Sequence, residues 1–206
     1  DGALTGQING LAALVAASPG SGTVGGIDRL TWAFWRNKSY SALTDGGAAV
    51  SAANVFNYFM ALWVQLVRGP DKPDLILTDN NVWIAYATFM QGMARITDTE
   101  SDLAKAGFSS LKFMTADVVL DGGFQGTTSD GNTFGSNGAG AVGGAPTSTA
   151  FFLNTKYIML QPHAERNMVP LRPDRFSLNQ DAMVRLLGWA GNMTISNSFL
   201  QGVLTT

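Results

Sequence analysis

An α+β fold is predicted for this chain of 206 residues. Three observations predict it. Apolar residues recur at helical spacing around residue 60, a short apolar strand and a second helical pattern follow, and several strand-like segments lie nearer the C-terminus. The length is sufficient for one substantial core, or for two small lobes that share one.

The first helix is predicted over residues 51–67. Its large apolar residues recur every three or four positions, which places them on one face. Ser51 is the expected N-cap, because a serine oxygen can accept a hydrogen bond from a free backbone N–H of the first turn. Gly69 and Pro70 are the expected end of this helix.

A buried strand is predicted over residues 74–78, and a second helix over residues 82–90, with Asp79 or Asn80 as its cap. Further strand-like segments follow at residues 113–120, 151–154, 157–160, 183–190 and 193–197. The first 50 residues are rich in small residues and are expected to be irregular or extended. Residues 122–145 contain nine glycines and few large apolar residues, which predicts a mobile, protease-sensitive surface loop.

The composition favours assembly with other chains. Charged residues make up 14% of the chain, against about 25% in typical globular proteins. A surface so poor in charge is expected to be partly covered by other chains, although a Gly- and Ser-rich monomer is the alternative. The net charge of −2 argues against a strongly basic face for nucleic acid. No apolar run is long enough to span a membrane, and the absence of cysteine excludes disulfides and thiolate metal sites and fits a reducing compartment.

Reactive side chains are scarce, so the chain is not expected to be an enzyme, and no catalytic, cofactor or metal site is predicted. Residues 20–25 match the G-x-G-x-x-G pattern of nucleotide-binding turns. However, Pro19 lies directly before the turn, no convincing helix follows it, and no clear second strand supplies the acidic residue that would bind a ribose. His163 is the only histidine, and no nucleophile motif accompanies it. Asp98, Glu100 and Asp102 lack the glycine and terminal glutamate of a calcium loop.

Charged residues gather beside prolines in two places, residues 68–74 and 165–175. Arginine and carboxylate pairs make directional contacts that suit subunit boundaries, while pairing within the chain to fix loops is the alternative. The candidate contacts between subunits are Asp28, Arg29, Arg36, Arg68, Asp71, Glu165, Arg166, Arg172, Asp174 and Arg175.

An ordered series of segments resembles major capsid proteins of tailed bacteriophages and prophages. The series begins with Gly25-Gly26-Ile27-Asp28-Arg29, Phe34-Trp35-Arg36-Asn37, Val67-Arg68-Gly69, Pro73-Asp74-Leu75-Ile76, Leu111-Lys112-Phe113, Ala116-Asp117-Val118-Val119 and Asp121-Gly122-Gly123. It closes with Phe152-Leu153-Asn154-Thr155-Lys156-Tyr157, Arg166-Asn167-Met168-Val169-Pro170-Leu171, Asn179-Gln180-Asp181-Ala182, Trp189-Ala190-Gly191-Asn192-Met193-Thr194 and Ser196-Asn197. The resemblance covers essentially the whole chain and depends on the order of the segments, not on any single motif.

This resemblance implies the Hong Kong 97 type capsid fold. Residues 45–150 would form its axial lobe, with the loop at 122–145. Residues 1–44 would belong to the peripheral lobe, to which the strands of residues 151–206 would return. The N-terminal arm, extended β-hairpin loop and long spine helix of such proteins have no counterpart in this sequence. A C-terminal portion of a longer capsid protein, or a reduced member of the family, is therefore expected.

The resemblance also implies a function and partners. Copies of the chain would form pentamers and hexamers of an icosahedral virion capsid around double-stranded DNA. The DNA would be contacted without sequence specificity, and scaffolding and portal proteins are possible partners. Assembly would take place in the bacterial host cytoplasm, without a membrane. The alternatives are an encapsulin-like compartment shell and a nucleotide-binding enzyme that uses residues 20–25.

Overall fold

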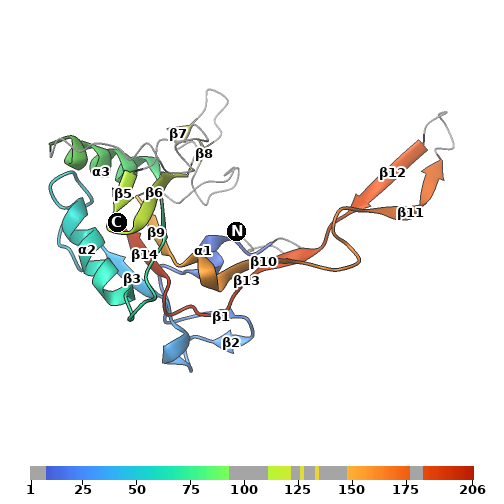
Figure 1. The fold of residues 1–206 in the computed structure, drawn as a ribbon, viewed down its shortest axis with the longest axis horizontal. Helices are drawn as coiled ribbons and strands as arrows, with labels where there is room; N and C mark the ends of the chain where they lie inside the picture. Colours follow the sequence, from blue (N-terminus) through green and yellow to red (C-terminus); the bar gives the residue numbers. More distant parts are fainter. Residues whose placement is uncertain (1–7, 93–110, 122–125, 128–132, 135–147, 177–182) are drawn as a thin grey trace.

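A six-stranded mixed sheet forms the centre of the body in the computed structural model (Figure 1). The structure describes residues 8–92, 111–121, 126–127, 133–134, 148–176 and 183–206. The strand order is β3 (Lys38–Ser41), β14 (Gly202–Thr205), β9 (Ala150–Leu153), β4 (Leu75–Thr78), β6 (Ala116–Leu120) and β5 (Leu111–Phe113). The pairs β3–β14 and β4–β6 are parallel, and the other neighbouring pairs are antiparallel. The predicted α+β class is therefore confirmed.

The sheet joins segments that are distant in sequence. Strand β3 comes from the first 44 residues, β4, β5 and β6 from the middle of the chain, and β14 from its end. The sheet therefore crosses the predicted boundaries at residues 44 and 150. Neither β3 nor β14 was predicted, because each has only four residues and depends on the other for its hydrogen bonds.

Both faces of the sheet are covered. Helices α2 (Val55–Leu66) and α3 (Asn80–Gly92) pack on one face, where Ile76, Phe152 and Leu204 join their core. Phe151 and Val203 directly precede Phe152 and Leu204, and they belong to a second cluster on the other face of the sheet. This cluster includes residues of α1 (Leu11–Leu14). This two-residue alternation is the expected periodicity of strands that are buried on both sides.

The predicted first helix is confirmed, but its predicted cap is wrong. Helix α2 begins at Val55, and no side chain caps its N-terminus. The backbone N–H of Ser51 instead donates to Oδ1 of Asn54 at 2.7 Å, which stabilises a turn before the helix. The helix ends as expected before Gly69, whose φ of +58° lies in the left-handed region.

The second helix is confirmed together with its cap. Oδ1 of Asp79 accepts the backbone N–H of Val82 at 2.9 Å, and Oδ2 accepts the N–H of Ser148 at 2.5 Å. Asp79 therefore holds the first turn of α3 and also ties it to the segment that leads into β9.

The single strand predicted for residues 113–120 is wrong. The chain reverses at Met114 and Thr115, so that β5 and β6 form an antiparallel hairpin with Phe113 opposite Ala116. Met114 has a φ of +52°, a conformation that a non-glycine residue rarely adopts. Packing of Phe113, Ala116 and Val118 in one core stabilises this turn, although the local sequence contains no turn signal there.

The glycine motif at residues 20–25 belongs to a hairpin, not to a nucleotide-binding turn. Strand β1 (Thr23–Val24) pairs with β2 (Ile27–Asp28), and Gly25 and Gly26 make the turn with positive φ values. The next helical element is the three-residue 3₁₀ turn η1 (Ala33–Trp35). Because the motif does not run from a strand into a helix N-terminus, it lacks the geometry that cradles phosphate.

A two-stranded arm projects from the body (Figure 1). After the 3₁₀ turn η2 (Thr155–Tyr157), β10 (Ile158–Pro162) pairs with β13 (Gly191–Ile195). Farther out, β11 (Val169–Phe176) pairs with β12 (Met183–Gly188). The predicted strands at 157–160, 183–190 and 193–197 are confirmed within a residue or two, whereas their joint projection was not predicted.

Two predicted features fall largely on residues outside the described ranges. Of the glycine-rich segment 122–145, only β7 (Gly126–Thr127) and β8 (Thr133–Phe134) are described, and they pair with each other. Asp98, Glu100 and Asp102 lie wholly outside. Among the helices of the described ranges, none combines the length and apolar character needed to cross a bilayer.

Stability at high pH is expected to depend on Tyr86. Its hydroxyl donates to the backbone oxygen of Lys112 at 2.8 Å, and burial raises the pKa of Tyr86 to about 12. An unfolded tyrosine ionises near pH 10. The free energy of unfolding should therefore be independent of this group below pH 10 and should fall between pH 10 and 12, where only the unfolded state is ionised. Urea titrations from pH 8 to 12 measure this fall, and Tyr86→Phe should remove most of it. An equal fall in both proteins would contradict the assignment.

Candidate assembly surfaces

The loop that follows β2 presents apolar side chains to solvent. Leu30, Trp32 and Phe34 are 70%, 52% and 62% exposed, and the rings of Trp32 and Phe34 lie edge to face with centroids 5.8 Å apart. Exposed tryptophan and phenylalanine are typical of anchor residues in protein interfaces.

Three of the predicted contact residues brace this loop from within. Asp28 accepts the backbone N–H of Leu30 at 2.9 Å and the hydroxyl of Thr31 at 2.7 Å. The hydroxyl contact, followed by the Leu30 contact, lowers the pKa of Asp28. Arg36 donates through Nε to the backbone oxygen of Arg29 at 2.6 Å and through Nη2 to that of Leu30 at 2.8 Å. These bonds restrict the loop before any partner binds, which reduces the entropy lost on association.

Arg29 is only 2% exposed. Its Nη2 donates to the backbone oxygens of Leu14 and Ala13, while Nε has no partner. Burial lowers the pKa of this guanidinium. Arg29 thus acts within its own chain, where it ties the loop to α1.

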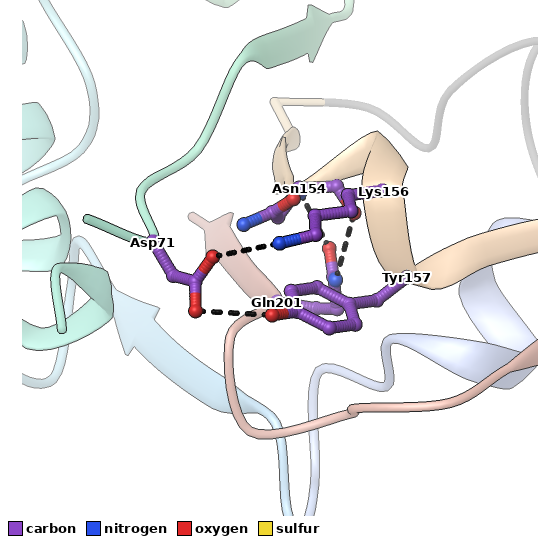
Figure 2. Close-up of polar contacts among 5 residues, drawn as sticks. All are labelled: Asp71, Asn154, Lys156, Tyr157 and Gln201. Carbon is purple, nitrogen blue, oxygen red and sulfur yellow. Dashed lines mark hydrogen bonds and ion pairs between the residues drawn. The ribbon is translucent and has the colours of Figure 1, made fainter. Parts of the chain in front are cut away.

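The corner at residues 68–74 is held by residues of the η2 turn (Figure 2). Asp71 accepts the Tyr157 hydroxyl at 3.0 Å and lies 3.6 Å from Nζ of Lys156. Beside them, the backbone N–H of Asn154 donates to Oε1 of Gln201 at 2.8 Å, and Nε2 of Gln201 donates back to the Asn154 oxygen at 3.2 Å. Asp71 therefore joins two segments of one chain. This agrees with the alternative in which charged residues pair within the chain to fix loops.

Arg68 also acts within the chain. Its guanidinium lies 5.3 Å from the ring centroid of Phe199, and Nζ of Lys38 lies 4.2 Å from the same centroid. Cations over an aromatic face are stabilised by the charge distribution of the ring. The two contacts fix the loop before β14 against β3 and the 68–74 corner.

The Tyr157 contact at this corner can be tested by removing one oxygen. Tyr157→Phe is expected to lower the free energy of unfolding by about 1 kcal/mol, because Asp71 loses a hydrogen-bond donor. Tyr40→Phe is the control, since the Tyr40 hydroxyl makes no hydrogen bond to the described residues, and its change should stay below about 0.5 kcal/mol. Equal losses in urea denaturation would show that the Asp71 contact is not stabilising.

The remaining predicted contact residues lie on the arm. Glu165 and Arg166 are exposed at the turn between β10 and β11, where the backbone N–H of Glu165 donates to Nδ1 of His163 at 3.2 Å. Arg172, Asp174 and Arg175 lie in β11, and only their backbone is described. Their role between subunits stays a prediction, as it does for the five charged residues on the body.

The described side chains of the arm form no separate buried cluster. Every side chain from residue 159 to residue 170 is exposed. The arm also carries six of the fifteen large apolar side chains that are exposed among the described residues: Met159, Leu160, Met168, Val169, Leu186 and Leu187. An isolated two-stranded ribbon is marginally stable in water, so this surface suits contact with another chain.

The outer helices form a third surface that is poor in charge. Helices α2 and α3 contain no Asp, Glu, Lys or Arg, and Val64 and Ile84 on them are 65% and 59% exposed. Surface helices normally carry charged residues on the solvent side, whereas the centres of interfaces are depleted of charge. The absence of charged residues from both helices is visible in the sequence and could have indicated this surface.

Within the described ranges, no three His, Cys, Asp or Glu side chains gather to hold a metal ion. No protein-family model matches this chain, and no curated protein matches it either.

Proposed function

We propose that this chain is a structural subunit of an icosahedral phage capsid, with a fold of the Hong Kong 97 type, that encloses double-stranded DNA. The observation that carries the proposal is the projecting arm. It exposes six large apolar side chains among its described residues and projects away from the body of its own chain. Such an element gains stability when it lies on a neighbouring subunit.

The distribution of charge supports the same function. Asp28, Arg29, Arg36, Arg68 and Asp71 make contacts that stiffen the body, while three largely apolar or uncharged surfaces remain open. A subunit needs a rigid body with several separate contact surfaces, because each copy in a shell touches several neighbours. Individually modest contacts then give a stable closed lattice.

The proposal is tested with the full-length protein that contains this chain, expressed together with its scaffolding partner. Electron microscopy and sedimentation should show closed shells, and we expect DNA inside mature shells to resist nuclease. Leu160→Asp on the arm should reduce the yield of shells at least tenfold. Leu43→Asp on the body is the matched control, since Leu43 is 56% and Leu160 57% exposed. A protein that stays monomeric at high concentration with its scaffolding partner present would rule the function out.

A further inference from the structure

The two edges of the arm differ in their proline content. The outgoing strands β10 and β11 contain Pro162, Pro170 and Pro173. The returning strands β12 and β13 contain no proline. Proline has no backbone N–H and therefore makes a strand edge unsuitable for pairing with another strand.

The edge formed by β12 lacks this protection. In the described part of the chain, β12 pairs with β11 alone, so that one of its edges has no strand beside it. Residues 185–187 are exposed there, with Leu186 at 41% and Leu187 at 65%. An apolar, proline-free edge of six residues is a template for the addition of another strand.

We propose that β12 pairs antiparallel with β12 of a second copy of this chain, giving a four-stranded sheet across a two-fold axis. The inference deepens the proposed function and rests on it only for its biological setting. The same strand is the best partner because β12, with six residues, is the longest proline-free strand with an open edge in the described part of the chain. The open strand β13 has five residues, and the edge strands β3 and β5 of the six-stranded sheet have four and three. An edge that pairs with its own copy also satisfies the self-complementarity of a two-fold interface.

Arg185, the one charged residue of β12, restricts the register. In an antiparallel pair related by a two-fold axis, one residue lies opposite its own counterpart at the centre. Arg185 at that position would place two guanidinium groups opposite each other, which is unfavourable. A centre at Leu186 or Leu187 instead places leucines of both copies together and keeps the two arginines apart.

Engineered cysteines test this pairing directly, because the natural chain has none. Leu186→Cys and Leu187→Cys are each oxidised in the otherwise unchanged full-length protein. At least one of them should give disulfide-linked dimers. Val169→Cys on the proline-containing strand is the matched control, since Val169 and Leu186 are both 41% exposed. Its yield of dimer should be at least tenfold lower.

A proline substitution supplies an independent measurement. Leu187→Pro places a residue without an N–H in β12, at the position opposite Pro170. We expect it to weaken dimerisation at least tenfold in sedimentation, with the thermal unfolding of the body unchanged. Dimers that persist in this variant would overturn the proposal, and so would preferential crosslinking at position 169.

The result separates this inference from the proposed function. Closed shells without crosslinks at 186 or 187 would overturn the β12 pairing and leave the capsid function standing. Crosslinked dimers that never form shells would support the β12 pairing and contradict the capsid function.

Discussion

Replacing Phe59 by alanine is expected to lower the free energy of unfolding by about 4 kcal/mol, because the substitution leaves a cavity at the centre of the core. Phe59 is fully buried. Its ring stacks on Tyr86 at 5.3 Å and meets Phe113 and Phe152 edge to face at 5.4 and 5.1 Å. These partners come from α3 and from two strands, so the substitution weakens the packing of both helices on the sheet. Urea denaturation followed by far-ultraviolet circular dichroism measures the change.

Val64→Ala is the control for this prediction. Val64 lies on the same helix but is 65% exposed, so its truncation should change the free energy of unfolding by less than about 0.5 kcal/mol. If Phe59→Ala cost no more than Val64→Ala, the packing of α2 described here would be wrong.

Replacing Asp79 by alanine is expected to lower the free energy of unfolding by about 3 kcal/mol. Asp79 is 1% exposed and accepts the backbone N–H groups of Val82 and Ser148. Loss of a helix cap costs about 1 kcal/mol, and a backbone N–H left without a partner away from water adds about 1–3 kcal/mol. The same urea titration measures this loss.

Asp79→Asn is the matched control for the cap. Its single side-chain oxygen can still accept one of the two N–H groups, so the loss should be clearly smaller than for alanine. An alanine variant as stable as the asparagine variant would show that the two hydrogen bonds contribute little.

The helices and the strand between them were predictable because their signals are local. Apolar spacing predicted α2 and α3, and the polar residues before the second helix limited its cap to Asp79 or Asn80, of which the structure shows Asp79. The hairpin at residues 111–120 was missed for a related reason. Its residues are uniformly typical of a strand, and the reversal at Met114 follows from packing in the core, not from a glycine or proline.

The sequence predicted that the charged residues form pairs, but not whether their partners lie in the same chain or in another. The sequence marked Asp71 as a group that needs a partner, but its partners Lys156 and Tyr157 lie more than 80 residues away along the chain. Contacts within the chain and between chains require the same residue types. Local sequence therefore cannot distinguish them until the fold brings the partners together.

The sequence by itself determined the α+β class, the shortage of charge, the absence of cysteine and the two apolar helices. The tertiary structure alone decided which strands pair, and hence that β3 lies beside β14 while residues 158–195 leave the body as an arm. The physical reason is that helix hydrogen bonds join residues four apart, whereas strand hydrogen bonds join any two segments whose burial is compatible. The exposed apolar side chains of the arm stay uncovered because the six-stranded sheet is completed without the arm strands.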